Sequence, residues 1–243
     1  MEILGIDVGG SGIKGAPVNT LTGTLSSARH RVKTPKGAAP EEVAREINNL
    51  AQYFRWDGPV GIGFPAPIKH GVIKMAANIS SEWVGMNANE YLSKSTNCKV
   101  TVCNDADVAG LAEMTFGAGK NQPGTVILIT LGTGIGSAVF YNGILLPNTE
   151  FGHVQINGRD AEARASDASR QRDGLSWKKY ARRLSRYLLE MQKLFWPDLF
   201  IIGGGISKDF DSYAPLLEVD TPVVRATFLN EAGIVGAALA AQT

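Results

Sequence analysis

The chain contains the same local design twice: an apolar strand, a glycine-rich bend, a second strand and a turn. The first copy spans residues 3–16 around the bend Gly9–Gly12, and the second spans 124–141 around the bend Gly132–Gly136. The second copy is followed by Asn142-Gly143, a strong signal for a two-residue hairpin because both residues tolerate positive φ. Two copies of one design predict an internally duplicated fold with two lobes and a cleft between them.

The remaining stretches alternate between strand and helix patterns, which predicts a mixed α/β fold. Pro40 followed by two acidic residues is typical of a helix start, and Ser176 is a good N-cap for a long amphipathic helix. We expect further strands at 26–34, 59–64, 99–103, 198–202 and 222–226, and helices from Pro40 to Phe54 and over 89–94, 108–116, 177–196 and 233–240.

We divide the chain after residue 108. The smaller lobe, 1–108, would carry the first bend, and the larger lobe, 109–243, would carry the second. The final helix is rich in small residues, which suits close packing, and we expect it to pack back at the hinge between the lobes.

The bulk composition excludes several classes of function. The net charge is +1, so the overall charge gives no case for nucleic acid binding. The two cysteines, Cys98 and Cys103, form no CxxC pair, which argues against zinc and against a disulfide framework. Met1 leads directly into a strand without a basic, apolar leader, so we expect a cytoplasmic protein without a membrane segment.

The glycine bends are candidate phosphate sites. Residues 7–14 supply backbone N–H groups, the Ser11 hydroxyl and the Lys14 ammonium, although the Walker pattern is absent. A single bend of this kind is more often a tight turn than a binding site. Because a third glycine turn, Gly203–Gly205, also follows an apolar strand, the set of three favours phosphate binding.

Asp105 lies where an apolar strand meets a helix, and loops beyond strand ends carry chemistry in α/β sheets. It could be a general base or the helix N-cap. Asp107 could provide the cap instead, which would leave Asp105 for catalysis.

A second group of polar residues follows the later hairpin. Glu150 and His153 lie three apart, and Glu162 follows them. An isolated histidine is more often structural than catalytic. Clustered carboxylate and imidazole groups, however, match a polyhydroxyl ligand, since each sugar hydroxyl both donates and accepts hydrogen bonds.

In combination and order, six motifs resemble those of the ROK family of sugar kinases, within the actin-like ATPase superfamily. The resemblance covers nearly the whole chain and is strongest to the polyphosphate-dependent glucokinases of that family. The motifs are Asp7-Val-Gly-Gly-Ser-Gly-Ile-Lys-Gly15, Ala76-Ala-Asn78, Asn104-Asp-Ala-Asp107, Leu131-Gly-Thr-Gly-Ile-Gly136, Pro147-Asn-Thr-Glu-Phe-Gly-His153 and Trp196-Pro-Asp-Leu-Phe-Ile-Ile-Gly-Gly-Gly205.

The resemblance implies a two-lobed enzyme that moves the terminal phosphoryl group of inorganic polyphosphate to the 6-hydroxyl of glucose. Asp105 would be the general base, and Mg²⁺ would bridge donor oxygens beside Asp7. The residues implied to bind the sugar are Asn78, Asn104, Asp105, Glu150, His153 and Glu162. The residues implied to bind the donor phosphates are Asp7, Gly9, Gly10, Ser11, Gly12, Lys14, Gly132, Thr133, Gly134, Gly203 and Gly204.

Two features common in the family are missing from this sequence. The stretch 157–166, where many members carry a cysteine-rich zinc loop, has no cysteine, so zinc is not expected. A helix-turn-helix of the kind found in ROK repressors is also lacking, which agrees with the expectation of no nucleic acid partner. The resemblance further implies a cytoplasmic homodimer acting in carbohydrate metabolism at the level of glycolysis.

The identity of the phosphoryl donor stays open at this point. A polyphosphate chain needs a cationic track, and the long expected helix carries Lys178, Lys179, Arg182, Arg183 and Arg186 away from its apolar stripe. The same residues could form an ordinary solvated helix face. The alternatives are an ATP-preferring glucokinase or glucomannokinase of the same family and, less favoured, a sugar-binding regulator without catalysis.

Overall fold

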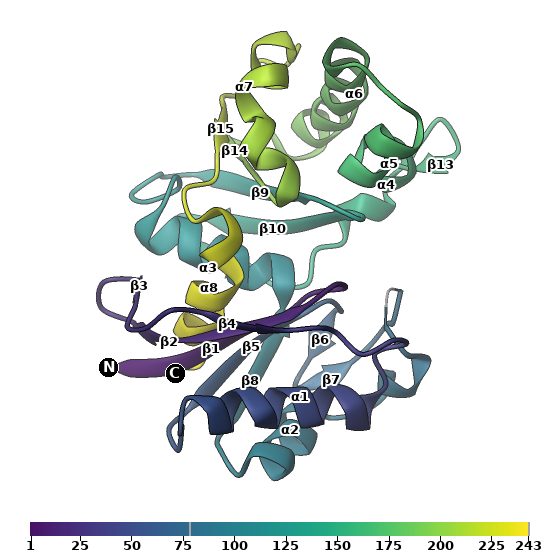
Figure 1. Cartoon of the computed structure of the whole chain (residues 1–243). Helices are drawn as coiled ribbons and strands as arrows, with labels where there is room; N and C mark the ends of the chain where they lie inside the picture. The colour runs from purple at the N-terminus through teal and green to yellow at the C-terminus, as the bar shows by residue number, and fades with distance from the viewer. Residues whose placement is uncertain (78, 243) are drawn as a thin grey trace. The chain divides into compact units, whose positions relative to one another are not determined.

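The computed structural model describes residues 1–77 and 79–242 (Figure 1). The chain separates into two compact units, one formed by Met1–Ala112 with Glu231–Thr243 and the other by Glu113–Asn230. The division therefore falls after Ala112 rather than after residue 108, and the C-terminal helix belongs to the first unit. None of the helices in the described ranges is long and apolar enough to cross a membrane.

The first unit is built on a sheet of order β3-β2-β1-β5-β8, with β4 also paired to β2. β1 and β2 form an antiparallel hairpin, whereas β1, β5 and β8 run parallel. Of the expected strand at 26–34, only residues 30–32 form a strand, and a second short strand, at 24–25, lies just before it. The strands are β1 (Glu2–Val8), β2 (Ile13–Asn19), β3 (Thr24–Leu25), β4 (His30–Val32), β5 (Val60–Phe64), β6 (Ile68–Lys69), β7 (Val72–Ile73) and β8 (Val100–Asn104).

Helices cover both faces of this sheet, as Figure 1 shows, with α1 and α2 on one face and α8 on the other. Leu4 and Ile6 of β1 share a buried cluster with Ile47 and Leu50 of α1, because alternate residues of a strand point to the same face. The helices are α1 (Pro40–Tyr53), α2 (Ala88–Thr96), α3 (Asp105–Phe116), which continues into the second unit, and α8 (Ala232–Ala240).

The small residues of α8 let it lie directly against its neighbours. A Cβ added to Gly5 of β1 would overlap the Ile234 carbonyl, and one added to Gly61 of β5 would overlap the Ala237 carbonyl. A Cβ on Gly236 would in turn overlap the carbonyl of Val108 in α3. The close approach therefore depends on glycine on both sides of the contact.

The second unit repeats the plan of the first. Its sheet has the order β11-β10-β9-β14-β15, with β9 and β10 antiparallel and β9, β14 and β15 parallel. Asn142 and Gly143 both have positive φ, 50° and 79°, which confirms the predicted hairpin turn. The strands are β9 (Thr125–Leu131), β10 (Ile135–Tyr141), β11 (Ile144–Leu146), β12 (Gln155–Ile156), β13 (Arg159–Asp160), β14 (Leu199–Gly203) and β15 (Val223–Arg225).

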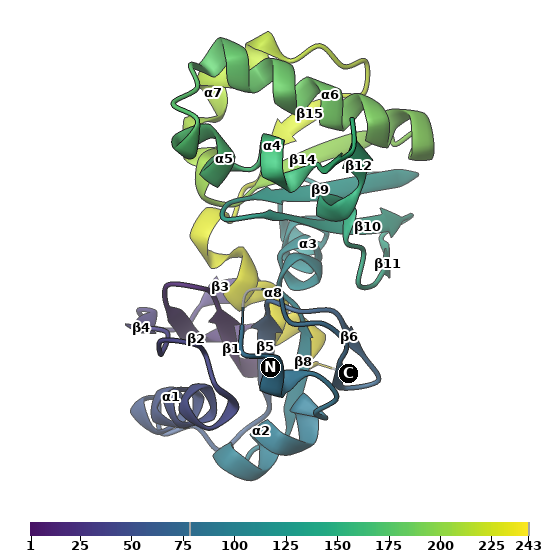
Figure 2. The ribbon, with the colours of Figure 1, turned by 90° about the vertical axis from the view of Figure 1, so that its right-hand side faces the viewer.

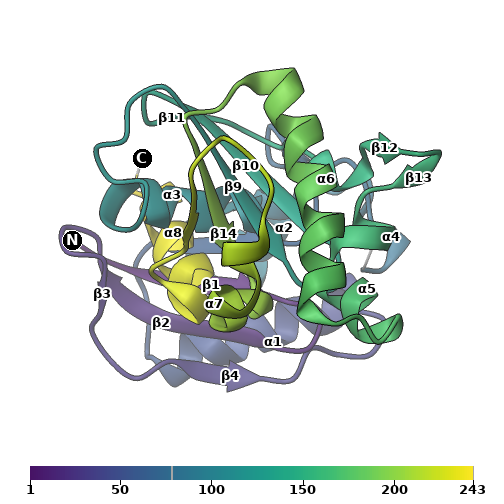
Figure 3. The ribbon, with the colours of Figure 1, turned by 90° about the horizontal axis from the view of Figure 1, so that it is seen from above.

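The long helix α6 lies across this second sheet (Figure 2). Its apolar stripe, including Tyr180, Leu184 and Leu188, is buried in one cluster with Ile127 and Phe200 of the sheet. The Ser176 hydroxyl accepts from the N–H of Lys179, so the predicted N-cap is confirmed. Seen from above, α4 and the β12–β13 hairpin lie beside α6 (Figure 3). The helices are α4 (Glu162–Ala165), α5 (Asp167–Arg172), α6 (Trp177–Phe195) and α7 (Phe210–Tyr213).

Candidate active site

The first glycine turn joins β1 to β2 and presents unpaired backbone donors. One backbone hydrogen bond closes it, from the N–H of Gly9 to the carbonyl of Gly12 at 3.1 Å. Within the described ranges, the N–H groups of Gly10, Ser11 and Gly12 have no hydrogen-bond partner. A Cβ on Gly10 would meet nothing within 4 Å, so this side of the turn is open. Successive free N–H groups of this kind form an anion-binding concavity.

Two side chains that the sequence did not single out hold this turn in place. The Thr34 hydroxyl donates to the carbonyl of Gly9 at 2.6 Å, and Arg31 Nη2 donates to the carbonyl of Ser11 at 2.8 Å. A Cβ on Gly12 would overlap the Arg31 guanidinium, so the arginine packs directly against the backbone of the turn. Because Arg31 and Thr34 follow the turn by about twenty residues, only the pairing of β4 with β2 brings them to it.

Lys14 and Asp7 form an ion pair of 2.8 Å beside the same turn, with side chains 22% and 17% exposed. They are direct partners in the β1–β2 register. Gly233 of α8 leaves room for the carboxylate, since a Cβ there would lie 2.7 Å from Asp7 Cγ. The two predicted phosphate-site residues are therefore held together by the hairpin itself.

Asp7 supplies one carboxylate of the kind that Mg²⁺ binds. Mg²⁺ prefers oxygen ligands and is usually held by one or two carboxylates together with substrate phosphates. In the described part of the chain, no three His, Cys, Asp or Glu side chains gather as a metal site. A bound ion would therefore rely on donor phosphates, with Asp7 as its carboxylate.

The strand–helix junction at β8–α3 places Asp105 half-buried at the first position of α3. The Asn104 side-chain carbonyl accepts from the N–H groups of Ala106 at 2.9 Å and Asp107 at 3.1 Å. Asn104 is thus the helix cap, and the prediction that Asp107 could take this role is wrong. Asp107 is 2% exposed.

The side-chain amide of Asn104 also donates a hydrogen bond. Its Nδ2 donates to the carbonyl of Ala66 at 3.3 Å, and the side chain is 5% exposed. Asp105 Oδ1 accepts from the N–H of Ala106 at 2.8 Å, which orients the carboxylate. Asn104 therefore sets the geometry of the junction, while Asp105 is the more accessible of the two.

The second glycine turn contacts one of the predicted sugar residues. Glu162 Oε2 accepts from the N–H of Ile135 at 3.3 Å, and a Cβ on Gly134 would overlap that carboxylate. On the other side of the turn, the N–H of Ala168 donates to the carbonyl of Gly132 at 3.0 Å. The segment that carries α4 and α5 therefore holds the turn at both ends.

Glu150, His153 and Glu162 lie within electrostatic range of one another. The pKa of Glu150 is raised mainly by burial and further by Glu162, while His153 opposes the rise. The pKa of His153 is also raised, mainly by its hydrogen bond to Asp160, against the effect of burial. The carboxylates of Glu162 and Glu150 add to that rise. The structure thus brings together three of the predicted sugar residues.

Asp160 is a further member of this cluster that sequence reasoning missed. Its Oδ2 lies 3.0 Å from His153 Nδ1, and its Oδ1 accepts a hydrogen bond from the Gln155 amide. Asp160 comes seven residues after His153, and only the β12–β13 hairpin, in which Gln155 pairs with Asp160, brings them together.

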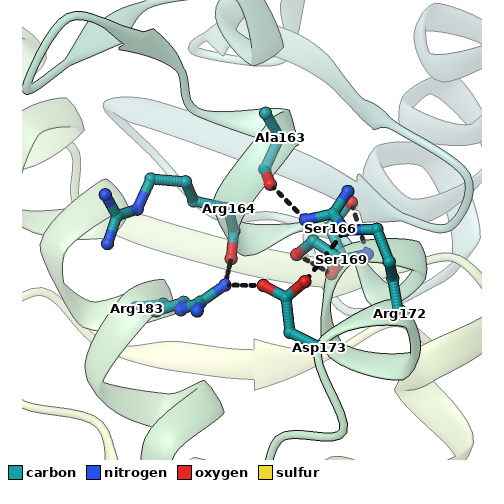
Figure 4. A network of polar contacts seen from close by, with 7 residues as sticks. All are labelled: Ala163, Arg164, Ser166, Ser169, Arg172, Asp173 and Arg183. Atoms are coloured by element: carbon teal, nitrogen blue, oxygen red, sulfur yellow. Dashed lines mark hydrogen bonds and ion pairs between the residues drawn. The ribbon is translucent and has the colours of Figure 1, made fainter.

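A network of arginines ties the α4–α5 segment to α6 (Figure 4). Arg183 Nη1 donates to Asp173 Oδ2 at 2.6 Å and to the carbonyl of Arg164 at 3.4 Å. Arg172 bonds Asp173 Oδ1 at 2.9 Å and the carbonyl of Ala163 at 2.8 Å. The hydrogen bonds from Arg172 and Arg183 lower the pKa of Asp173 to about 2.

The predicted cationic track on α6 divides into two kinds of residue. Lys178, Lys179, Arg182 and Arg186 are exposed. Arg183 is paired with Asp173 and has a side chain that is 25% exposed. Arg183 therefore has a structural partner, whereas the other four are available to solvent.

The third glycine turn, after β14, has a packing role that the structure makes plain. Gly204 has φ 79°, and a Cβ there would overlap the carbonyl of Leu131 at the end of β9. The turn therefore lies against the start of the Gly132–Gly136 turn within the second unit. The remaining predicted sugar residue, Asn78, lies outside the described residues.

Comparison with known proteins places the chain among sugar kinases. The model of the ROK family matches residues 3–167. The chain belongs to the ROK family. A polyphosphate glucokinase of Mycobacterium tuberculosis is 49% identical to this ROK protein, and the matched region covers 97% of this chain and 89% of the relative. The Mycobacterium leprae polyphosphate glucokinase is 46% identical over 97% of this chain and 73% of the relative.

Solved structures show the same fold. The crystal structure of an inorganic polyphosphate/ATP-glucomannokinase from Arthrobacter sp. strain KM matches with a TM-score of 0.95 and 48% identity, covering 98% of this ROK chain and 97% of the other. A ROK glucokinase from Streptomyces griseus, in complex with glucose and AMPPNP, matches with a TM-score of 0.84. At 24% identity and coverage of 100% and 99%, the second match supports the fold alone.

Proposed function

We propose that this chain transfers the terminal phosphoryl group of inorganic polyphosphate to the 6-hydroxyl of glucose, giving glucose 6-phosphate. The observation that carries the proposal is the contact between Glu162 and the Gly132–Gly136 turn. A phosphotransferase needs an acceptor site next to a donor site, and here one carboxylate of the Glu150–His153–Glu162 cluster is bonded to a phosphate-type turn. The identity to polyphosphate glucokinases supports the choice of substrates.

In the proposed mechanism Asp105 is the general base. Its carboxylate would orient the 6-hydroxyl of glucose and accept its proton as the oxygen attacks the terminal phosphate in line. Asn104 would keep that carboxylate in place by capping α3. The Asn104 amide already donates to the carbonyl of Ala66. We therefore propose that Asn104 positions Asp105, in addition to its predicted contact with the sugar.

Glu150, His153 and Glu162 would bind the remaining sugar hydroxyls, together with Asn78. The raised pKa of Glu150 extends the pH range over which it can donate a proton to a hydroxyl as well as accept one. Hydrogen-bond complementarity of this kind discriminates strongly against ligands that lack the hydroxyl.

The donor phosphates would lie on the free N–H groups of the Gly9–Gly12 turn, with Lys14 beside them. Gly132, Thr133 and Gly134 would also bind donor phosphates, and Gly203 and Gly204 would lie near the far end of the donor. Mg²⁺, held by donor oxygens and Asp7, would neutralise charge on the transferred group. Release of Lys14 from Asp7 would then free its ammonium for the donor.

A long polyanion also needs guidance outside the turns. We propose that the exposed cations of α6, Lys178, Lys179, Arg182 and Arg186, attract the polyphosphate chain, with Arg183 anchoring the helix to the α4–α5 segment. A second candidate function is an ATP-dependent glucomannokinase of the same family, which is favoured by the structural match to a polyphosphate/ATP-glucomannokinase.

The test is a comparison of donors. Purified protein would be assayed for glucose 6-phosphate formation with long-chain polyphosphate and with ATP, at fixed glucose and Mg²⁺. We expect a higher kcat/KM with polyphosphate. A higher kcat/KM with ATP would favour the second candidate, and no product with either donor would overturn both. We also propose a cytoplasmic homodimer, which light scattering of the purified protein and fractionation of cells would test.

A further inference from the structure

A cavity of about 790 Å³ opens in the first unit beside the Gly9–Gly12 turn. Gly9 and Gly10 form part of its wall, and the stretch 33–38 after β4 forms another part. The rest of the wall comes from α1, from β5 and from three residues beside them: Val43, Arg45, Glu46, Phe64, Val8, Pro65 and Ile79. The free N–H group of Gly10 therefore belongs to a residue that lines an open hollow.

The hollow is cationic. Its charged lining residues are Lys33, Lys36, Arg45 and one acid, Glu46, which leaves a net charge of +2. The Glu46 carboxylate lies 3.7 Å from Arg45 Nε and accepts a hydrogen bond from the Asn49 amide at 3.3 Å, so both of its oxygens already have a partner. Within the described ranges, Lys33 and Lys36 are exposed and have no ion-pair partner.

The lysines are fixed to the phosphate turn through Thr34. This residue, which lies between them in sequence, donates its hydroxyl proton to the carbonyl of Gly9 at 2.6 Å. Arg31, in β4 just before this stretch, donates to the carbonyl of Ser11. A single segment therefore closes the turn and carries the cations of the adjoining hollow.

We propose that this hollow is a subsite for the phosphoryl units of polyphosphate that continue beyond those held by the Gly9–Gly12 turn, with Lys33 and Lys36 as its cations. The inference rests on the proposed function. A polyphosphate chain carries negative charge on every unit, so unpaired ammonium groups past the turn stabilise it. A nucleotide donor has an uncharged nucleoside beyond its phosphates and gains nothing from them.

The test compares two double variants with the same change of charge. Lys33→Gln/Lys36→Gln removes the subsite cations, and Lys94→Gln/Lys99→Gln removes two exposed lysines of the same unit that lie outside the hollow. We expect the first variant to raise KM for long-chain polyphosphate about tenfold or more. Its KM for ATP, tripolyphosphate and glucose should change less than about twofold. The control variant should behave as the wild type.

Salt dependence provides a second readout that a merely structural effect would not move. Because cations that bind a polyanion release its counterions, the slope of log KM for long-chain polyphosphate against log salt should fall in magnitude by about one to two. An unchanged slope, a polyphosphate KM within about twofold of the wild type, or an equal rise in KM for ATP would overturn the subsite.

Binding measured without turnover separates this inference from the proposed function. Calorimetric titration of long-chain polyphosphate into the glucose-free protein should show binding that weakens about tenfold in Lys33→Gln/Lys36→Gln. If the wild type binds polyphosphate through these lysines yet produces no glucose 6-phosphate, the subsite stands and the proposed reaction fails. Equal binding by wild type and variant overturns the subsite, even where polyphosphate is a good donor.

Discussion

The imidazole of His153 and the carboxylate of Asp160 lie 3.0 Å apart, Nδ1 to Oδ2, across the β12–β13 hairpin. A carboxylate in this position holds a proton on Nδ1 and leaves Nε2 as the ring nitrogen available to a ligand. The pairing thus gives His153 a defined orientation next to Glu150 and Glu162.

Asp160→Asn should lower the pKa of His153, because the hydrogen bond to Asp160 is the largest cause of its raised pKa. The measurement is an NMR titration of the His153 ring proton. We also expect a higher KM for glucose, since the ring loses its fixed orientation. A titration curve that matches that of the wild type would contradict the role of Asp160.

The same pair has a signed effect on stability. A raised folded-state pKa stabilises the fold fully below the unfolded value of about 6.5, and this contribution is lost as pH rises through the higher folded pKa. Wild type should therefore exceed Asp160→Asn in stability by more at pH 5.5 than at pH 9. Both side chains are 39% exposed, so we expect a difference below about 1 kcal/mol in urea unfolding.

Asp105→Ala should abolish turnover and leave glucose binding largely intact, because the carboxylate takes the proton in the chemical step. Loss of a general base costs about 10² to 10⁴ in rate. Steady-state assays and glucose titration by intrinsic fluorescence measure the two effects. Asp105→Asn keeps the shape and should be equally inactive. Activity near that of the wild type in either variant would contradict the assignment of Asp105 as the general base.

Asn104→Ala should destabilise the first unit by about 1–2 kcal/mol, because it removes the cap of α3. Asn104→Asp keeps the capping oxygen and loses the bond to Ala66, so it should cost less. Urea unfolding of both variants provides the comparison. If Asn104→Asp were the more damaging change, the amide bond to Ala66 would outweigh the cap.

Arg182→Glu should raise KM for long polyphosphate more than KM for ATP, because Arg182 is exposed on the proposed track. Arg183→Glu should in addition destabilise the second unit, since it would place a carboxylate beside Asp173. Kinetics with both donors and thermal unfolding distinguish the two residues. Equal effects of Arg182→Glu on the two donors would count against the track.

Gly236→Ala should destabilise the first unit strongly, by more than about 2 kcal/mol, because the new methyl group would overlap the Val108 carbonyl. Gly205→Ala is a matched control, since a Cβ at Gly205 meets nothing within 4 Å. Denaturant unfolding measures both variants. Similar stability of the two would show that α8 can shift away from α3.

Much of the fold could be predicted because its signals are local. The glycine bends and the apolar runs on either side of them predicted both hairpins, β1–β2 and β9–β10. The long helices α1 and α6 were visible from their apolar spacing and their start signals. The bounds of the short helices α4 and α5 were not predicted, since four and six residues are too few to establish a periodic pattern.

The chemical types in the candidate site were visible in the sequence, but their partners were not. Asn104, Asp105 and Asp107 are all acceptable helix caps, and only the placement of Asn104 against α3 and Ala66 decides among them. In the second unit, Glu113 likewise has partners that no local pattern predicts. It is fully buried and accepts from the N–H groups of Thr227 and Phe228, more than a hundred residues away.

The sequence by itself determined the duplicated α/β plan, the glycine turns and the acidic and imidazole groups that follow them. These depend on short-range periodicity and on the backbone freedom of glycine. The tertiary structure alone decided which groups meet: Asp160 with His153, Asp173 with Arg183, and the lysine-bearing segment after β4 with the first phosphate turn. Such pairings depend on sheet register and helix packing, which bring together residues that no local pattern connects.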